Sequence, residues 1–433
     1  MRAERRWLER GKDALIILLA LSALYLLSMT PLVQDSGVLE LLRPPEPAGG
    51  GTAASANAAA AVPARMAVNA PAGRYGLQYD QAALDEALTL LSPLLGEALA
   101  SAWETRAVTE RQWREYLGRT GIYFDFSGQI PLNALGGWLR GAGDCLLDGS
   151  ARRLLLAADG EDDVLLCWQD EAAGAYYVSS TALTQRLHLD PAVEDYTANG
   201  AYFAFEDGDM AQWLEPYTLI AEGAQGVRTY TVSDPLAAPE GVEALLEALS
   251  FSGRDHAAVS GGEAYLDGDD RLVIAGDGTV TYRTARPEKY PAGTAQPDGS
   301  PSQAVEAAWA LAERSIGTSC GEARLCLTQV EEAAGGWRVC FGYRLDAAAV
   351  RVGDAGWAAE FWIWDGYIVK FTLQARCYTD TGEEVLLLPI DRAAALLPEL
   401  THRKVELAIQ YQDRGGGTVD PEWVIVEEDA QPS

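Results

Sequence analysis

The chain has 433 residues, and its 63 acidic side chains outnumber its 33 basic ones, so the formal net charge is −30. Such an acidic surface repels nucleic acid, anionic lipid headgroups and anionic cell-wall polymers, which argues against tight binding of any of these. A cationic partner is one interpretation of the charge, and a surface that is merely kept soluble is the other. The length allows about two or three domain cores of ordinary size.

The first predicted element is a membrane span at Ala14–Val33. This stretch carries no formal charge, and a helix of about 20 apolar residues crosses the hydrocarbon layer of a bilayer. Five basic residues precede the span, whereas the next one after it is Arg43. The positive-inside rule therefore predicts a cytoplasmic N-terminus at 1–13 and a single-pass protein of the cell membrane whose bulk is extracytoplasmic. A cleaved signal peptide is the alternative, although no small-x-small cleavage site follows the apolar core.

Two helices are expected after a flexible tether. The tether is predicted at 34–72, which is rich in Ala, Gly and Pro and lacks a periodic apolar face. Leucines then recur at helical spacing from Gln81 to about Ala102, although Pro93 should kink or divide this helix. The second helix is expected at Glu110–Leu117, with Thr109 as its N-cap.

The pattern of residues 73–288 predicts an extracytoplasmic α+β region of one or two subdomains, built from short strands, turns and helices. Its clearest hairpin joins Val164–Trp168 to Ala175–Ser179, two apolar runs separated by a polar turn. A helix is expected at Ser180–Arg186. Three short strands are expected within Gly262–Arg283, where DGDD and GDG mark the turns.

A stretch rich in Pro, Gly and Ser at 289–301 predicts a linker, and a C-terminal domain is expected at 302–433. This domain begins with a helix at Ser302–Ser315, capped by its serine. Four strands should follow in meander order, with a tight turn at Asp365–Gly366 between the last two. The four strands are Ala323–Val330, Trp337–Arg344, Gly356–Trp364 and Tyr367–Tyr378. A shorter round of one helix and two strands is expected at Ile390–Leu397, Lys404–Tyr411 and Trp423–Val426.

The predicted fold class is α+β, with one N-terminal transmembrane helix followed by antiparallel sheets and packed helices, the C-terminal part being a helix plus a four-stranded meander. One helix covers only one face of the meander, yet large apolar side chains occur on both faces. The second face is therefore either a partner surface or covered by a neighbouring domain. The candidate interaction face consists of Trp357, Phe361, Trp362, Ile363, Trp364, Tyr367 and Phe371.

Motifs for catalysis or cofactor binding are absent from the sequence, which has no phosphate-binding glycine loop, zinc-protease motif or nucleophile elbow. The three histidines are far apart and the six cysteines form no CxxC pair. No catalytic residue, cofactor or metal ligand is therefore predicted. Cys326 and Cys340 lie on successive predicted strands, where a cross-strand disulfide and two buried thiols are both open. The carboxylates of Asp267–Asp270 are interpreted as a solvated hairpin turn rather than a cation site.

Several stretches together resemble the YycH/YycI-type regulators, membrane-anchored proteins of Gram-positive bacteria that accompany the WalK sensor kinase. The similar features include the short basic N-terminus with one span and the closing DPEWVIVEED. They also include GIYFDFSGQIPL at Gly121–Leu132, NGAYFAFE at Asn199–Glu206 and the segment Leu249–Arg283, which ends in a hairpin of short strands. The alanine-rich tether and the very acidic surface depart from the family pattern and leave the subfamily open.

The resemblance implies a non-enzymatic regulator of a two-component sensor histidine kinase of the WalK type, which acts in cell-envelope signalling through contacts of its span and its ectodomain. A paralogous regulator would be a second partner. Two other classes of function stay open from the residues. One is a ligand- or envelope-binding protein with an aromatic cleft at Trp357, Trp362 or Trp364. The other is a hydrolase whose site is assembled from residues distant in sequence.

Overall fold

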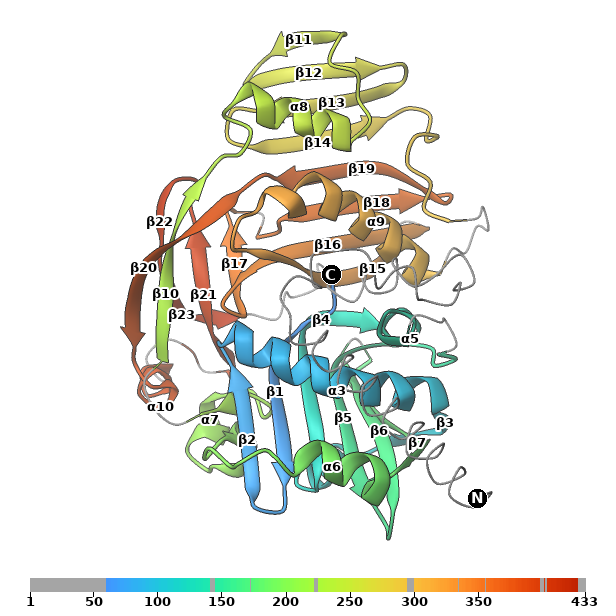
Figure 1. Cartoon of the computed structure of the whole chain (residues 1–433), viewed down its shortest axis with the longest axis vertical. Helices are drawn as coiled ribbons and strands as arrows, with labels where there is room; N and C mark the ends of the chain where they lie inside the picture. Colours follow the sequence, from blue (N-terminus) through green and yellow to red (C-terminus); the bar gives the residue numbers. More distant parts are fainter. Residues whose placement is uncertain are drawn as a thin grey trace, which may run out of the picture. The chain divides into compact units, whose positions relative to one another are not determined.

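The computed structural model describes residues 60–426 apart from gaps at 141–144, 172, 222–224, 294–299, 334, 355, 398–400 and 402 (Figure 1). The predicted cytoplasmic segment, the predicted span at Ala14–Val33 and most of the predicted tether lie outside the described residues. None of the described helices is long and apolar enough to cross a membrane. The described chain is a mixed α+β structure with predominantly antiparallel sheets.

The N-terminal sheet contains seven antiparallel strands in the order β2-β1-β4-β5-β6-β7-β3. Its strands are β1 (Pro63–Ala70), β2 (Gly73–Gln78), β3 (Trp103–Val108), β4 (Gly121–Pro131), β5 (Ser150–Asp159), β6 (Asp163–Asp170) and β7 (Ala175–Thr184). The hairpin predicted from the sequence is confirmed as the pair β6 and β7, in which Cys167 lies opposite Val178.

Both faces of the N-terminal sheet are covered by other elements. These elements are α3 (Gln81–Ser101), α4 (Glu110–Leu117), α5 (Leu132–Arg140), β8 (Tyr202–Phe203) and β9 (Leu219–Ile220). Phe124 and Leu154 belong to the core beneath α3 and α5, whereas their neighbours Tyr123 and Leu155 belong to a separate core with α4, β8 and β9. Because successive strand residues face opposite sides and both sides are covered, Leu154–Ala158 in β5 and Val164–Trp168 in β6 are apolar at every position.

The C-terminal sheet contains eleven strands in the order β11-β12-β13-β14-β19-β18-β16-β17-β21-β23, with β15 paired to β16. Its strands are β11 (His256–Val259), β12 (Gly262–Asp267), β13 (Asp270–Ala275), β14 (Thr279–Thr284), β15 (Arg324–Ala333), β16 (Gly336–Leu345), β17 (Ala348–Val352), β18 (Ala359–Trp364), β19 (Tyr367–Gln374), β21 (Glu406–Asp413) and β23 (Pro421–Val426). All neighbours pair antiparallel except β17 and β21, which pair parallel.

The predicted meander is present as β15, β16, β18 and β19, which pair in this order. Along the chain, β17 follows β16 and precedes β18. Helix α9 (Pro301–Ser315) lies across these strands (Figure 1). The turn before β19 has φ values of 50° at Asp365 and 75° at Gly366. Positive φ at both central residues is the geometry of a tight hairpin turn, which Asp-Gly adopts readily.

The remaining elements form a small third sheet and several short helices. The third sheet has the order β20-β10-β22, with β10 (Gln225–Ser233), β20 (Cys377–Leu387) and β22 (Gly417–Val419). The helices are η3 (Gln185–Leu189), α6 (Asp190–Val193), η4 (Ala204–Glu206), α7 (Met210–Trp213), α8 (Pro239–Ala248), η5 (Gly317–Ser319) and α10 (Ile390–Ala394).

The prediction of a tether is wrong for its last part, because Pro63–Ala70 is the buried strand β1. This strand pairs with β2 on one side and β4 on the other, so its backbone groups are satisfied in spite of a weak apolar pattern. Pro63 occupies the first position of the strand, where proline is tolerated.

Three local predictions about helices also need correction. Helix α3 is not divided at Pro93, which is exposed while Leu91 and Leu95 on either side of it are buried. The helix expected at Ser180–Arg186 is instead the end of β7 followed by the π-helical turn η3. There the Thr181 hydroxyl donates to the Val164 carbonyl at 2.6 Å, and pairing with β6 overrides the local preference. Helix α9 is capped by Ser300, ahead of the serine expected from the sequence, because proline fits the first helical position.

The predicted linker at 289–301 lies partly outside the described residues. Strand β14, which precedes it, pairs with β19, which follows it. Strand β10 likewise pairs with β20 and β22. The strand pairing therefore continues across the expected boundary, and the division into an N-terminal region at 73–288 and a C-terminal domain at 302–433 stays a prediction.

Candidate functional site

Three residues of the predicted interaction face belong to the core. Phe361, Ile363 and Phe371 are at most 3% exposed. The Phe361 ring centre lies 5.6 Å from that of Phe371 and 6.0 Å from that of Phe341. Trp309 of α9 in turn lies 5.6 Å from Phe341. The alternation of the strands turns these three residues toward the helix, so they cannot contact a partner.

The other members of the predicted face are more accessible. Trp357 precedes β18 and Tyr367 begins β19, and both are half-buried. The remaining two, Trp362 and Trp364, lie 6.1 Å apart between ring centres, and Trp364 is 38% exposed. They alternate with Phe361 and Ile363 along β18 and so face away from α9.

Cations border this aromatic surface. The Lys370 ammonium lies 5.1 Å from the Trp362 ring centre, and the Arg338 guanidinium lies 5.7 Å from it. Both distances are within the range of a cation–π interaction. Arg338 also donates to Glu360 at 2.7 Å. The surface is therefore a short aromatic strip with both signs of charge, and its role as a partner surface stays a prediction.

A cavity of about 270 Å³ lies near the beginning of α9. Its lining includes Ser300, Ala304, Trp337, Ile363 and Gly366. None of the three tryptophans at which the ligand-binding alternative expects an aromatic cleft lines this cavity. This cavity therefore does not have the composition that the ligand-binding alternative expects.

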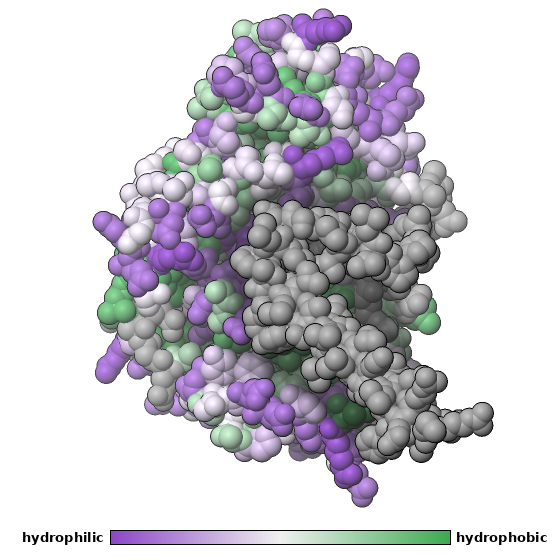
Figure 2. All heavy atoms as spheres, viewed as in Figure 1, coloured by the Kyte–Doolittle hydropathy of each residue, from purple (hydrophilic) through white to green (hydrophobic). Residues whose placement is uncertain are grey.

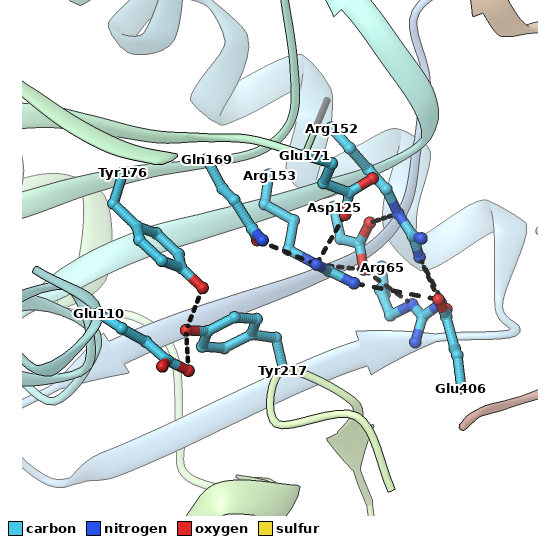
Figure 3. A network of polar contacts seen from close by, with 10 residues as sticks. All are labelled: Arg65, Glu110, Asp125, Arg152, Arg153, Gln169, Glu171, Tyr176, Tyr217 and Glu406. Carbon is cyan, nitrogen blue, oxygen red and sulfur yellow. Dashed lines mark hydrogen bonds and ion pairs between the residues drawn. The ribbon is translucent and has the colours of Figure 1, made fainter. Parts of the chain in front are cut away.

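A cluster of buried charges joins the N-terminal sheet to β21 (Figure 3). The junction cluster, as we call it, consists of Arg65, Asp125, Arg152, Arg153 and Glu406. Each of these side chains is at most 15% exposed, and that of Asp125 is fully buried. Charged side chains are rarely buried to this extent unless they are paired. Each of these buried charges therefore needs a partner of opposite charge nearby.

The strand register forms the row from which the cluster is built. Arg65 of β1 lies opposite Asp125 of β4, which lies opposite Arg153 of β5. Gln169 of β6 continues the row. A shift of register follows Asp125 in the pairing of β4 with β5 and allows Arg152 to reach the same carboxylate. Opposite charges thus alternate across one rung of the sheet, which is the favourable order.

Glu406 closes the row from the C-terminal side. Its two carboxylate oxygens lie 2.7 and 2.8 Å from one terminal nitrogen of Arg152, and Arg65 donates to the same carboxylate. Asp125 accepts from Arg152 at 2.8 Å, and its other oxygen lies 3.3 Å from Arg65 Nε. Two arginines therefore each bridge both acids, one of which comes from each half of the fold.

The contacts favour the ionised forms of Glu406, Arg152 and Arg65. Burial alone would raise the pKa of Glu406, but Arg152 and Arg65 bring it well below its ordinary value. Burial would likewise lower the pKa of Arg152, yet Asp125 and Glu406 raise it well above its ordinary value. The same two acids raise the pKa of Arg65 against the effect of burial. For these three residues, the attraction between opposite charges thus outweighs the effect of burial on the pKa.

A second chain of polar contacts extends the cluster to α4 (Figure 3). Arg153 donates to Glu171 at 2.7 Å, and its guanidinium lies 5.4 Å from the ring centre of Tyr217. The Tyr217 hydroxyl donates to Glu110 at 3.2 Å and lies 2.9 Å from the hydroxyl of Tyr176. The cluster therefore contacts both the strands and the helix that covers them.

The residues of the junction cluster are suited to holding two parts of the fold together. The three arginines of the cluster are balanced by Asp125, Glu406 and the neighbouring Glu171, and no serine, cysteine or histidine nucleophile is among its members. None of these residues was predicted as a site residue from the sequence. The available signal was Asp125 in the middle of the apolar run IYFDF, because a charge inside a strand covered on both faces must find a buried partner.

The histidines and cysteines do not assemble a site among the described residues. His188 accepts a hydrogen bond from the Thr184 amide, and His256 lies 3.1 Å from the Gly253 carbonyl oxygen. His402 lies outside the described residues. Within the described part of the chain, no group of His, Cys, Asp and Glu is placed to hold a metal ion.

The open question about Cys326 and Cys340 is decided in favour of free thiols. Both are buried and unpaired by a disulfide. Cys326 lies opposite Gly342, whereas Cys340 lies opposite Gln329, so the two cysteines do not face each other across the strands.

Comparison with known proteins places this fold. No family model matches the chain, and no curated protein matches its sequence. The crystal structure of YycH from Bacillus subtilis is similar, with a TM-score of 0.55 and 10% identity over 86% of this chain and 97% of that chain. The chain has the fold of YycH. The predicted resemblance is thus confirmed at the level of the fold. An uncharacterized protein from Eubacterium rectale matches 49% of this chain and 82% of its own, with a TM-score of 0.31 and 13% identity.

Proposed function

We propose that the chain is a non-enzymatic, membrane-anchored regulator of a sensor histidine kinase of the WalK type, with its folded bulk outside the cytoplasm. The observation that carries the proposal is the YycH fold, which matches nearly the whole length of YycH and most of this chain. The sequence supports it independently through the short basic N-terminus, the uncharged stretch at Ala14–Val33 and the absence of catalytic motifs.

The partner is proposed to contact the aromatic strip of Trp362 and Trp364 on the meander. These rings face away from α9, and exposed aromatic side chains are favoured at protein interfaces. The neighbouring Lys370 and Arg338 would add charge selectivity at the rim of such a contact. The predicted span would make a second contact, with the transmembrane helices of the kinase.

The decisive experiment is to purify the full-length tagged chain from membranes of its own host and to identify what accompanies it. We expect a sensor histidine kinase among the recovered proteins. A two-hybrid assay against all sensor kinases of the host should then show an interaction with the same kinase. Recovery of no kinase in either assay would overturn the proposal. A recovered cell-wall fragment or transport substrate would favour the binding-protein alternative instead.

Two variants locate the contact. Trp364→Ser should weaken the kinase complex by about 1 kcal/mol or more, the range of an interface hot spot. Trp103→Ser is the matched control, because Trp103 is 54% exposed on the edge strand β3. Equal binding by both variants would remove the aromatic strip from the proposal and leave the regulatory role intact.

Membrane topology and the role of the span are tested separately. A reporter fused after Ser433 should be active only outside the cytoplasm, and cytoplasmic activity would contradict the proposed arrangement. Exchange of Ala14–Met29 for an unrelated apolar helix should keep the protein in the membrane and abolish its effect on the kinase. Full regulation by the exchanged protein would assign the contact to the ectodomain alone.

A further inference from the structure

The C-terminal half of β20 is an exposed edge strand. Strand β20 pairs with β10 on one side, and at its beginning Tyr378 forms a bridge with Gly321. Beyond that bridge no described residue pairs with its other side. Figure 1 shows β20 at the left margin of the C-terminal half, with β10 next to it. Residues 381–386 are exposed one after another, so the strand is open along its edge and on its surfaces.

Large apolar side chains gather at the end of this strand. Val385 is 37% exposed, Leu386 74% and Leu388 57%, and Leu396 just after α10 is 54% exposed. In Figure 2 hydrophobic atoms lie at the left margin, where Figure 1 draws the end of β20. Leu386 is paired with Gly226 of β10, which has no side chain to cover it. An unpaired edge with exposed leucines is a template for the addition of another strand.

Two glutamates stand directly before these apolar residues. Glu383 and Glu384 are exposed, and neither carboxylate forms an ion pair with a described residue. The nearby Asp380 differs, because Arg228 donates to it at 3.1 Å. Arg228 also lies opposite Glu384 in the ladder, but it donates to Asp346 and Asp380. An added strand would therefore meet two carboxylates without an ion pair at one end of the edge and leucines at the other.

We propose that β20 is a docking edge for an extended segment of a partner protein that has basic residues at one end and apolar residues at the other. The backbone of that segment would pair with the open edge of β20. Its apolar side chains would cover Leu386 and Leu388, and its lysines or arginines would neutralise Glu383 and Glu384. The net charge of −30 would favour the approach of such a segment.

Pairing of β20 with the β20 of a second copy does not fit this edge. The stretch from Asp380 to Leu388 contains no lysine or arginine. Pairing of β20 with itself therefore supplies no cation to Glu383 or Glu384 in any register, and like charges close together across strands are destabilising. The proposal goes beyond the regulatory function and does not require the partner to be a kinase.

The test uses the full-length chain in detergent and a short labelled peptide in which a run of lysines adjoins a run of valines. We expect saturable binding in fluorescence anisotropy and slower amide hydrogen exchange in β20. A peptide with glutamates in place of these lysines should bind about tenfold more weakly or not at all, because several cross-strand charge contacts change sign. A valine–lysine peptide methylated on alternate backbone nitrogens along one edge should also lose binding, since it cannot form the ladder.

Charge reversal in the protein sharpens the test. The variant E383K/E384K should prefer the valine–glutamate peptide, whereas the variant E243K/E247K reverses two exposed glutamates of α8 and should keep the original preference. L386S should weaken binding without a change in the thermal melt, because this side chain is exposed. Equal binding of both peptides to the unaltered chain, or protection of a segment other than β20, would overturn the proposal. Dimerisation that L386S abolishes would instead assign the edge to a second copy.

Discussion

The junction cluster and the core beneath α9 hold the fold together by opposite means. At the junction, two arginines bridge Asp125 of the N-terminal sheet and Glu406 of β21. Beneath α9, Trp309, Phe341 and Phe361 pack ring against ring without a charge between them. An apolar core tolerates small changes gradually, whereas a buried ionic cluster depends on every partner. The two halves are therefore joined by a contact that requires particular partners and that we expect to depend on pH.

The largest effect is expected from Glu406→Ala. This variant removes one carboxylate and leaves Arg65 and Arg152 buried with a single acid between them. We expect a loss of about 3–5 kcal/mol in the free energy of unfolding, measured by chemical denaturation. Glu384→Ala, at an exposed glutamate, is the control and should change the stability by less than about 0.5 kcal/mol. A similarly small loss of stability for both variants would mean that water already solvates the charges of the cluster.

A paired replacement should recover much of that loss. The double variant Arg65→Met/Glu406→Met removes one cation and one anion and leaves Arg152 and Arg153 with Asp125 and Glu171. Replacement of a buried ion pair by apolar side chains is often neutral in stability, so the double variant should be at least about 2 kcal/mol more stable than Glu406→Ala. A double-mutant cycle with the two single methionine variants measures the coupling, and additive losses would show that the two residues act independently.

The junction should also make the stability depend on pH. The folded pKa of Glu406 lies well below its ordinary value of 4.5. A lowered folded pKa stabilises the fold fully above pH 4.5 and loses this contribution as the pH falls toward the folded pKa. The free energy of unfolding should therefore decline below pH 4.5, and Glu406→Gln should decline less steeply. Parallel pH profiles for the two proteins would assign the acid sensitivity to other carboxylates.

The apolar core should respond more mildly and without a pH dependence. Ile363 is 3% exposed beneath α9, and Ile363→Val removes one methylene from it. We expect a loss of about 0.5–1.5 kcal/mol that is the same at pH 7 and at acidic pH. A loss that grows on acidification would indicate that the core and the junction are coupled.

The smallest effect on stability is expected from Trp364→Ser, one residue along β18. Because Trp364 is 38% exposed on the side away from α9, its removal should change the free energy of unfolding by less than about 1 kcal/mol. Thermal melting compares it directly with Ile363→Val. A fall of the melting temperature by many degrees would show that the aromatic strip is internal packing and not a surface for a partner.

Local patterns in the sequence determined much of the C-terminal half. The alternation of apolar residues predicted the meander, and Asp365–Gly366 predicted its tight turn, because both depend on neighbouring residues only. The same is true of α4, whose capping Thr109 precedes an amphipathic run. The resemblance to the YycH/YycI-type regulators likewise rested on short stretches of sequence and was confirmed by the fold.

Only the tertiary structure decided which side chains are exposed and which charges are buried. The sequence placed Phe361 and Trp362 on one candidate face, but the position of α9 separates them into core and surface. It also assigned Pro63–Ala70 to a tether, although pairing with β2 and β4 makes it a central strand. Arg65 and Glu406 are 341 residues apart in sequence. No local pattern predicts such a pair, because its stability comes from the register of distant strands and from burial.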